Sequence, residues 1–296
     1  MKITRLLCFA ALCFTCLHGK AQQVLDVQAG KPGAAIKPTM WGIFIEDINM
    51  AADGGLYAEM VKNRSFEFNQ LLMGWDEKKE GKATGSLLIE NRGAEKPDNP
   101  RYLRVNVNSA GGSYGIINEG FRGMGVLKDS GYDFSVWASL HNNAAIVLRA
   151  ELVNGKGEKI GEAKVAPAGT TWQKYSVHFT AAATETHASL VVWFDGNGTI
   201  DIDMVSLFPS ATWKHRPGGL RADLVQMLAD LKPGFMRFPG GCIVEGRDLA
   251  NRYQWKKTVG NVEDRKLIIN RWNTEFSYKS TPDYFQSFGL GFYEYF

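Results

Sequence analysis

The chain has 296 residues, of which 45% are hydrophobic and 22% are charged, and its formal net charge is +3 at pH 7. This composition fits a folded protein with room for one large domain or two medium ones. The charge is too small to indicate a nucleic-acid partner.

The N-terminus has the pattern of a secretory signal peptide. Lys2 and Arg5 precede an apolar run from Leu6 to Leu17. Residues 19–21 follow, with the small residues of a cleavage site. The pattern predicts that residues 1–21 are cleaved and that the protein is secreted or periplasmic. No other apolar run approaches the roughly 20 residues that cross a bilayer, so we expect no membrane span.

Cleavage would change both the charge and the cysteine count. Three basic residues lie within residues 1–21, and their loss lowers the basic residues from 34 to 31, equal to the 31 acidic ones. Three of the four cysteines lie there as well, which leaves Cys242. The mature chain would be near neutral, with neither an internal disulfide nor a cysteine metal site.

Residues 24–40 form a short lead-in that is interrupted by glycine and proline. Residues 40–48 (MWGIFIEDI) follow as a continuous apolar run that contains the carboxylate pair Glu46 and Asp47. Such a run predicts a strand buried on both faces, as in a parallel sheet.

From about Phe66 to Pro209 short stretches alternate between apolar and polar residues, and glycine, asparagine and proline separate them. The stretches are 102–107, 132–140, 146–152, 172–179, 189–194 and 200–208. Period-two segments at regular spacing, without a helical pattern between them, predict an antiparallel β-sandwich.

Two features of this block have more than one interpretation. Residues 195–201 (DGNGTID) have acidic residues spaced somewhat as in a calcium loop but lack its late glutamate, so we expect a hairpin turn. Aromatic residues could stack on sugar rings, but alternation along the strands favours a core position for each; they are Trp75, Tyr114, Trp137 and Trp193.

After Gly219 the periodicity becomes helical, and the run 232–234 (KPG) ends it. The apolar positions are Leu220, Leu224, Val225, Leu228 and Leu231. A short apolar strand at residues 235–238 follows, and two glycines then allow a tight turn into polar residues. Strand, helix and strand predict a βαβ unit that the sandwich interrupts after its first strand. A long polar loop is expected from Arg247 to about Phe285, and the last residues resemble the opening of another helix.

Several runs together carry a resemblance to a known family. They are 40–49 (MWGIFIEDIN), 51–68 (AADGGLYAEMVKNRSFEF), 235–246 (FMRFPGGCIVEG), 251–260 (NRYQWKKTVG) and 288–295 (FGLGFYEY). In this order they closely resemble the α-L-arabinofuranosidases of glycoside hydrolase family 51, in the subgroup with a β-sandwich insert near the N-terminus. The resemblance covers nearly all of the chain after residue 35.

The resemblance implies an α/β plus all-β fold: an incomplete (β/α)8 barrel with an inserted antiparallel jelly-roll β-sandwich. Residues 22–65 would hold the lead-in and first barrel strand, residues 66–210 a sandwich that resembles a carbohydrate-binding module, and residues 211–296 the truncated start of the barrel. A complete barrel takes eight strands and about 250 residues, so only its first two strands would be present. The alternative is a complete small α/β domain, whose parallel pair would leave open edges.

The implied activity is the removal of terminal arabinofuranosyl groups from arabinan, arabinoxylan or arabinogalactan side chains, with retention and without a cofactor or metal. A retaining mechanism needs two carboxyl groups about 5–5.5 Å apart. In the family these glutamates end the fourth and seventh barrel strands, which this sequence lacks. We therefore assign no catalytic residue, expect the chain alone to be inactive, and expect Glu245 to shape the rim of the site.

Three residues are candidates for substrate binding. Glu46 matches the family glutamate that accepts hydrogen bonds from arabinofuranose hydroxyls, with a structural partner for a barrel arginine as the alternative. Arg237 matches the arginine that pairs with the nucleophile, and a structural ion pair is the alternative. Cys242 stands where some relatives have a sugar-contacting asparagine, but a thiol is a poor donor, so a buried, inert thiol is expected.

The partners implied are arabinose-containing plant polysaccharides or oligosaccharides, with a homo-oligomer left open. A second hypothesis belongs to another class: a secreted, non-catalytic carbohydrate-binding protein whose working part is the sandwich.

Overall fold

The computed structural model of this chain describes residues 24–142, 144–275 and 282–296. The predicted signal peptide at residues 1–21 lies outside them. The chain separates into two units, one up to Met40 and one from Trp41 onward. The described part of the first unit is exposed and irregular, apart from the 3-10 turn η2 (Pro38–Met40). No helix within the described ranges is long and apolar enough to cross a membrane.

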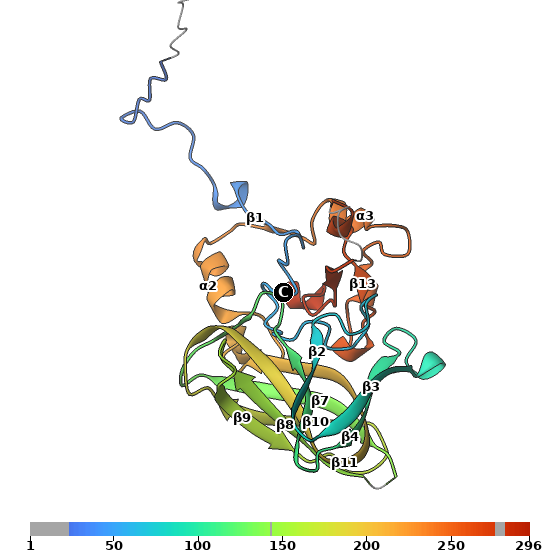
Figure 1. Cartoon of the computed structure of the whole chain (residues 1–296). Coiled ribbons are helices and arrows are strands. Elements are labelled where there is room, and N and C mark those ends of the chain that lie inside the picture. Colours follow the sequence, from blue (N-terminus) through green and yellow to red (C-terminus); the bar gives the residue numbers. More distant parts are fainter. Residues whose placement is uncertain (1–23, 143, 276–281) are drawn as a thin grey trace, which may run out of the picture. The chain divides into compact units, whose positions relative to one another are not determined.

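Ten antiparallel strands between Trp75 and Pro209 form a β-sandwich-like domain, as the alternating pattern predicted (Figure 1). They are β2 (Trp75–Gly81), β3 (Thr84–Asn91), β4 (Arg101–Asn108), β5 (Gly112–Asn118), β6 (Met124–Val126), β7 (Gly131–Leu140), β8 (Ala145–Val153), β9 (Lys159–Val165), β10 (Gln173–Thr180) and β11 (Glu185–Pro209). The 3-10 turn η3 (Gly93–Glu95) lies between β3 and β4.

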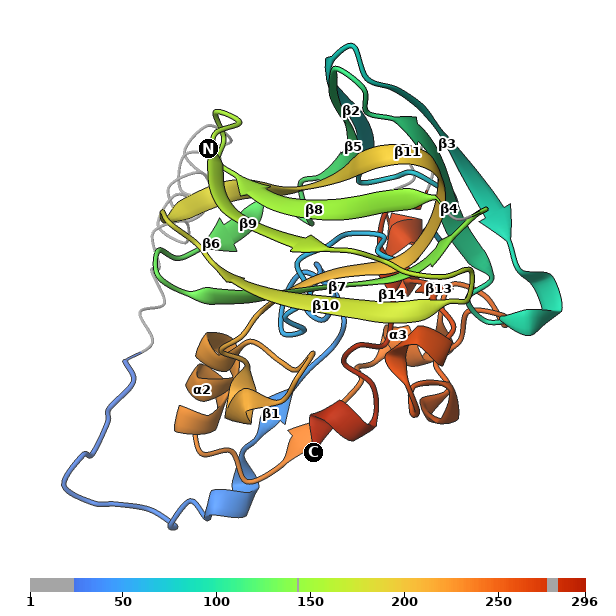
Figure 2. The same ribbon diagram turned by 90° about the horizontal axis from the view of Figure 1, so that it is seen from below.

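The long strand β11 belongs to both layers of the domain (Figure 2). Its first half pairs with β8, β5 and β6, and β8 in turn pairs with β9. Its second half pairs with β4 and β7, and β7 continues to β10. One continuous segment therefore joins the two layers.

The change of partners takes place near residues 195–198, where we had expected a hairpin turn. That expectation is wrong, because these residues are part of the continuous strand β11. Gly196 and Gly198 have φ angles of +145° and +133°, which favour glycine. A Cβ on Gly196 would lie 2.2 Å from the carbonyl oxygen of Ala145. The glycines therefore let the strand pass from one layer to the other instead of reversing it.

Strict alternation along β7 separates a core face from an outer face. Tyr132, Phe134, Val136, Ala138 and Leu140 are buried at 0–6% exposure. Burial of such side chains removes apolar surface from water, at roughly 25 cal/mol per Å². The sandwich thus has a contiguous core of its own.

The expected core positions of the sandwich aromatics are confirmed for Trp75 and Tyr114, which belong to the sandwich core. Trp193 is buried as well, at 2% exposure, but in a separate cluster with Val153 and Val191. The expectation is wrong for Trp137, which is half-buried and lies on the outer face of β7 with Ser135. The sequence already indicated this, because Trp137 alternates with the apolar residues of its strand and shares its face with Asp133 and Ser135.

The strands β1 (Ile43–Phe44) and β12 (Met236–Arg237) are parallel neighbours, in the register Ile43 to Met236 and Phe44 to Arg237. The helix α2 (Ala222–Asp230) precedes β12 as its spacing predicted. Val225 of α2 lines an apolar hollow with Ile43 and Met236. The adjacent, parallel strands are therefore as expected.

The expected burial of this pair is wrong. The regular part of the first strand is two residues long, and Phe44 and Met236 are 52% and 42% exposed. Each strand has only the other as a partner among the described residues, so each keeps one open edge and an uncovered face.

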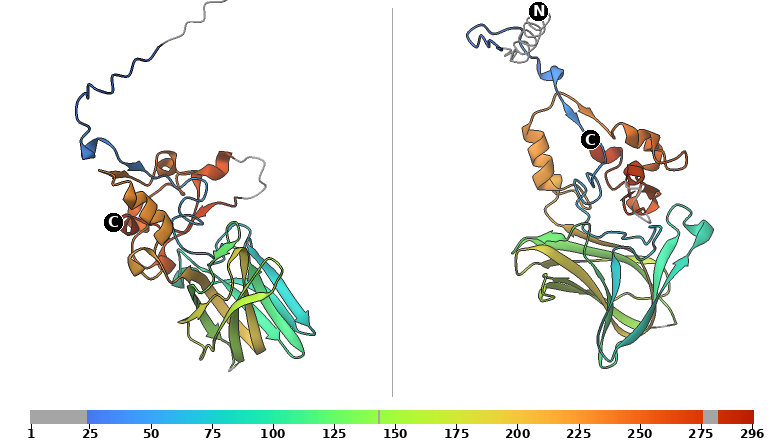
Figure 3. Two further views of the ribbon diagram at one scale, coloured as in Figure 1. Left: turned by 90° about the vertical axis from the view of Figure 1, so that its left-hand side faces the viewer. Right: turned by 45° about the horizontal axis from the view of Figure 1, so that its top comes forward.

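The region after β12 is better ordered than the expected polar loop. Two strands, β13 (Ile268–Ile269) and β14 (Phe285–Gln286), pair antiparallel within it. The short helical elements after β12 are α3 (Cys242–Glu245), η5 (Trp255–Lys257), η6 (Val262–Asp264), η7 (Arg271–Glu275) and η8 (Tyr293–Tyr295), while η4 (Trp213–His215) precedes α2. Two further views show these segments and the strands of the sandwich from other sides (Figure 3).

Candidate substrate-binding site

The predicted site lies where β1 and β12 end. The main-chain N–H of Ile45 donates to the carbonyl of Arg237 at 2.9 Å, and that of Asp47 donates to Pro239 at 3.4 Å. Since parallel strands end at the same edge, Glu46 comes to lie beside the turn at residues 239–241. In α/β folds this edge is where ligands bind.

Glu46 packs against the glycine turn. Its Oε1 atom accepts a hydrogen bond from the main-chain N–H of Ile243 at 3.1 Å. Gly240 has a φ of +138°, and a Cβ there would lie 2.4 Å from Cγ of Glu46. Within the described residues Oε2 has no hydrogen-bond partner, and the side chain is partly exposed. One oxygen is thus fixed while the other can accept from a ligand hydroxyl.

Arg237 projects to the same side of the strand pair as Glu46. It is in register with Phe44, and residues 44 and 46 share one face of a strand. The guanidinium carbon lies 4.6 Å from the centroid of the Phe44 ring. No carboxylate of the described chain forms an ion pair with Arg237, so the cation–π contact holds it here and leaves its donors available.

Cys242 is exposed, so the expectation of a buried thiol is wrong. It is the first residue of the single-turn helix α3, in which Ile243 is the buried position. Glu245, at the end of the same turn, is also exposed. The turn geometry therefore presents the thiol to solvent at the edge that carries Glu46.

The sequence did not indicate a role for Asp47, but in the structure its hydrogen bonds hold the end of the first strand in place. Its Oδ1 atom accepts from the N–H of Ala52 at 3.0 Å and from the hydroxyl of Tyr284. Its carbonyl accepts from the side-chain amide of Asn270 at 2.9 Å. Segments more than 200 residues later thereby fix the backbone that carries Glu46. The sequence feature that pointed to this edge was the adjacent carboxylate pair, in which Asp47 is buried and Glu46 is partly exposed.

Asp47 lies in a buried acidic pair. Burial, together with the nearby Asp53 carboxylate, raises the pKa of Asp47 to about 7. Burial also raises the pKa of Asp53, whose carboxylate accepts from Ser287 N–H at 2.7 Å and from its hydroxyl at 2.5 Å. Because Asp47 is only 3% exposed, its contacts serve to position the strand.

The runs 251–260 and 288–295 pack around this edge. Arg265 is buried and donates to Glu294 at 2.8 Å and to the carbonyl of Phe288. Gly289 lies so close to Tyr57 that a Cβ there would be 1.9 Å from the ring. Segments from both ends of the chain are thus held in direct contact.

The chain is similar to known α-L-arabinofuranosidases. Residues 227–296 match the family model described as the α-L-arabinofuranosidase 1 domain. An extracellular exo-α-L-arabinofuranosidase of Streptomyces chartreusis is 40% identical over 286 residues, which is 92% of this chain. The arabinose-bound structure of a GH51 α-L-arabinofuranosidase superposes with a TM-score of 0.76 over 90% of the chain at 30% identity. The chain is a homologue of the family 51 α-L-arabinofuranosidases.

The chain spans less than half the length of the curated relatives it matches. It covers 32% of the Streptomyces protein and 43% of the arabinose-bound structure. α-L-Arabinofuranosidase 1 of Arabidopsis thaliana is 36% identical over 257 residues, which is 83% of this chain and 38% of that protein.

Within its described ranges the homologue contains no group of three or more histidine, cysteine, aspartate or glutamate side chains that could hold a metal ion. At the β1–β12 edge the carboxylate of Glu46 and the guanidinium of Arg237 can both form hydrogen bonds with a hydroxylated ligand.

Proposed function

We propose that this chain belongs to an α-L-arabinofuranosidase that removes terminal arabinofuranosyl residues from arabinan-type or arabinoxylan-type polysaccharides, with retention of configuration. The 40% identity to the Streptomyces enzyme over 92% of the chain supports this. The observation that carries the proposal is Glu46, a partly exposed carboxylate held on one oxygen at the shared end of two parallel strands.

The proposed architecture is a (β/α)8 barrel whose first two strands are β1 and β12. The sandwich at residues 66–210 is inserted between them, residues 22–65 precede it and residues 211–296 follow it. An apolar hollow of about 250 Å³, lined by Ile43, Val225 and Met236 among others, supports this arrangement. Further strands and helices of a barrel would cover such a surface.

In the proposed site Glu46 accepts hydrogen bonds from hydroxyls of the arabinofuranose ring. Arg237 donates to the nucleophilic carboxylate and keeps it ionised, since a fixed cation favours the charged form. Cys242 contacts the sugar from the glycine turn. Specificity would follow because a ligand without the matching hydroxyl leaves a carboxylate unpaired.

The bond-breaking carboxyl pair is not assigned to any residue of this chain. The acid/base and the nucleophile of a retaining glycosidase lie about 5–5.5 Å apart, and they would be supplied by later barrel strands. The proposed reaction uses no cofactor, and the protein would act after export, as the Streptomyces relative described as extracellular does.

The test is a chimera in which this chain replaces the matching part of the Streptomyces enzyme. The Glu46→Gln variant should reduce kcat/KM on a chromogenic arabinofuranoside about a hundredfold, because a charged contact to the sugar is lost in the transition state. Glu245→Gln, which changes an exposed carboxylate near the same edge, is the matched control and should change kcat/KM less than about threefold. Full activity in the Glu46→Gln chimera would show that Glu46 does not bind the sugar hydroxyls.

The chain alone should not hydrolyse the same substrate. Turnover above that of its own Glu46→Ala variant would contradict the placement of the catalytic carboxylates outside this chain.

A further inference from the structure

The outer face of β7 and its neighbours carries a row of polar side chains around one tryptophan. Trp137 is paired in register with Lys174 of β10, and Ser135 is paired with Ser176. On the other side of β7, Ser206 of β11 is opposite Ser135. Register partners in an antiparallel pair point to the same face, so these side chains lie together on the face opposite the core.

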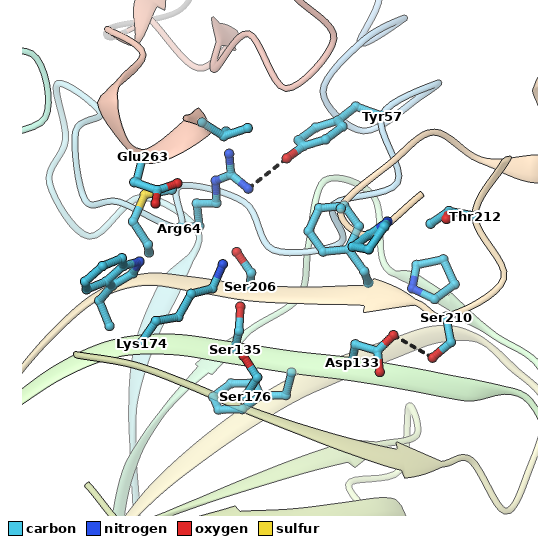
Figure 4. Close-up of a pocket in the computed structure, with 18 residues that line it drawn as sticks. Tyr57, Arg64, Asp133, Ser135, Lys174, Ser176, Ser206, Ser210, Thr212 and Glu263 are labelled. Atoms are coloured by element: carbon cyan, nitrogen blue, oxygen red, sulfur yellow. Dashed lines mark hydrogen bonds between the residues drawn. The ribbon is translucent and has the colours of Figure 1, made fainter. Parts of the chain in front are cut away.

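This face forms one wall of a hollow of about 320 Å³ (Figure 4). The opposite wall includes Tyr57, Arg64 and Glu263. A second hollow of about 190 Å³ is also lined by Trp137, Met204 and Glu263, so the two adjoin there. The first alone lies within the range of roughly 300–1,000 Å³ that is usual for small-ligand sites.

Some polar groups in the hollow are already used by the fold. Arg64 donates to Glu59 at 2.9 Å and to the hydroxyl of Tyr57 at 3.0 Å. Asp133 accepts from the hydroxyl of Ser210 at 2.7 Å. These pairs give the hollow rigid walls and are not free to bind a ligand.

Other polar groups there have no partner. The side chains of Ser135, Ser176, Lys174 and Glu263 make no hydrogen bond or ion pair with any residue of the described ranges. They come from β7, β10 and the η6 turn, and they line the same space. Convergent unpaired donors and acceptors beside an apolar surface are the composition of a ligand site.

Trp137 differs from the other tryptophans of the sandwich. The indole N–H groups of Trp75 and Trp193 donate to Asn63 and Glu151. Trp172 packs under the Arg92 guanidinium, which lies 4.6 Å from its ring centroid. Within the described chain Trp137 has neither an acceptor for its N–H nor an aromatic or cationic neighbour on its ring. It is therefore the tryptophan whose surface is available to a ligand.

The free charges decide the ligand class. The unpaired Lys174 and Glu263 carry opposite charges, and so do Arg64 and Asp133, which also line the hollow. The hollow therefore has no net attraction for an anion or a cation. Serine hydroxyls and charged groups can each bond to ligand hydroxyls, and the indole face can pack on an apolar ring surface. A neutral ring with many hydroxyls, which is a sugar, meets all of these conditions.

We propose that this hollow binds a neutral sugar residue of an oligosaccharide, with the ring stacked on Trp137 and its hydroxyls bonded to Ser135, Ser176, Lys174 and Glu263. The site would hold one sugar residue of a longer chain. It does not rest on the hydrolytic activity proposed above, because none of these residues belongs to the Glu46 site.

The experiment titrates the full chain with xylohexaose and with an arabinose-substituted xylo-oligosaccharide, followed by calorimetry and tryptophan fluorescence. We expect saturable binding at millimolar ligand or below. Trp137→Ala should weaken binding about tenfold or more, since the stacking surface is lost, whereas Trp137→Phe should stay within about threefold. Lys174→Ala should weaken it severalfold.

Two controls isolate the site. Leu88→Ala removes an exposed apolar side chain from β3, 53% exposed, and should leave binding unchanged. Xylohexaose carries no arabinofuranosyl group for the Glu46 site, so its binding separates failure of this proposal from failure of the proposed activity. Circular dichroism checks that Trp137→Ala keeps its fold, and a Lys174→Ala/Ser176→Ala double variant tests the hollow with the tryptophan in place.

The proposal is overturned if the unmodified chain does not bind either oligosaccharide at about 10 mM. It is also overturned if Trp137→Ala and the double variant both bind as tightly as the unmodified chain. Loss of xylohexaose binding in a Glu46→Gln variant, with binding kept in Trp137→Ala, would place this ligand at the strand ends and would equally overturn it. Tighter binding of an oligogalacturonate, an anionic sugar chain, would refute the neutral ligand class.

Discussion

The sandwich and the β1–β12 region differ in how far each covers its own apolar surface. In the sandwich Phe134, Leu148 and Leu190 are 0% exposed. In the other region Phe44 and Phe235 are each 52% exposed. Both regions consist of strongly apolar strands, so composition alone does not account for the contrast.

The difference shows the effect of topology on burial. Antiparallel strands joined by short turns form two layers that cover each other, and β11 closes the arrangement by belonging to both. A parallel pair needs flanking strands and helices on both faces. Here β1 has one strand partner in the described chain, so the residues of the proposed sugar site are held by side-chain contacts more than by a sheet.

The largest expected effect comes from the sandwich core. Phe134→Ala should lower the free energy of unfolding by about 3–5 kcal/mol, because it removes a fully buried ring and leaves a cavity. Phe235→Ala removes the same ring from a half-exposed position and should cost less than about 1 kcal/mol. Urea unfolding of both variants checks the contrast, and equal losses would contradict it.

The junction of the two regions should give the next effect. Glu59 accepts from the N–H of Leu207 in β11 at 3.0 Å and pairs with Arg64 at 2.9 Å, and both side chains are under 10% exposed. Arg64→Ala leaves this carboxylate buried without its cation, which should cost about 3 kcal/mol.

Arg237→Ala is the matched control, because Arg237 is exposed and forms no ion pair within the described ranges; it should cost less than about 0.5 kcal/mol. Thermal unfolding followed by circular dichroism measures both. An Arg64→Ala variant as stable as Arg237→Ala would show that the junction contributes little.

The smallest expected effect is a pH dependence at the site edge. Burial raises the pKa of Asp47 from 3.8 to about 7. Between these values the folded chain binds a proton that the unfolded chain has released, so the free energy of unfolding falls as pH rises from about 4 to 7. Asp47→Asn should flatten this fall by up to about 1.4 kcal/mol per pH unit within the window.

Unfolding in urea at several pH values between 4 and 8 measures this slope. Asp230→Asn, an exposed carboxylate on α2, should leave the slope unchanged. An unchanged slope in Asp47→Asn would mean that another buried carboxyl, such as Asp203, accounts for the pH dependence.

The sequence predicted local features where one chain segment was enough to determine them. Alternation located five of the ten sandwich strands, namely β4, β7, β8, β10 and β11, and helical spacing located α2, since both depend on which face of a segment is apolar. The runs 40–49 and 235–246 resemble the family's first two barrel strands, and this resemblance predicted that the strands of Ile43 and Met236 are neighbours. The sequence-based prediction failed at residues 195–201, where glycines can equally reverse a strand or bend it between layers.

By itself, then, the sequence determined the kinds of element, their order and the family resemblance, because periodicity and motifs are properties of contiguous residues. Only the tertiary structure decided that Cys242 is exposed, that Asp47 is bound by Asn270 and Tyr284, and that Trp137 faces an open hollow. These features depend on which distant segments cover a side chain, and that is set by packing across the whole chain.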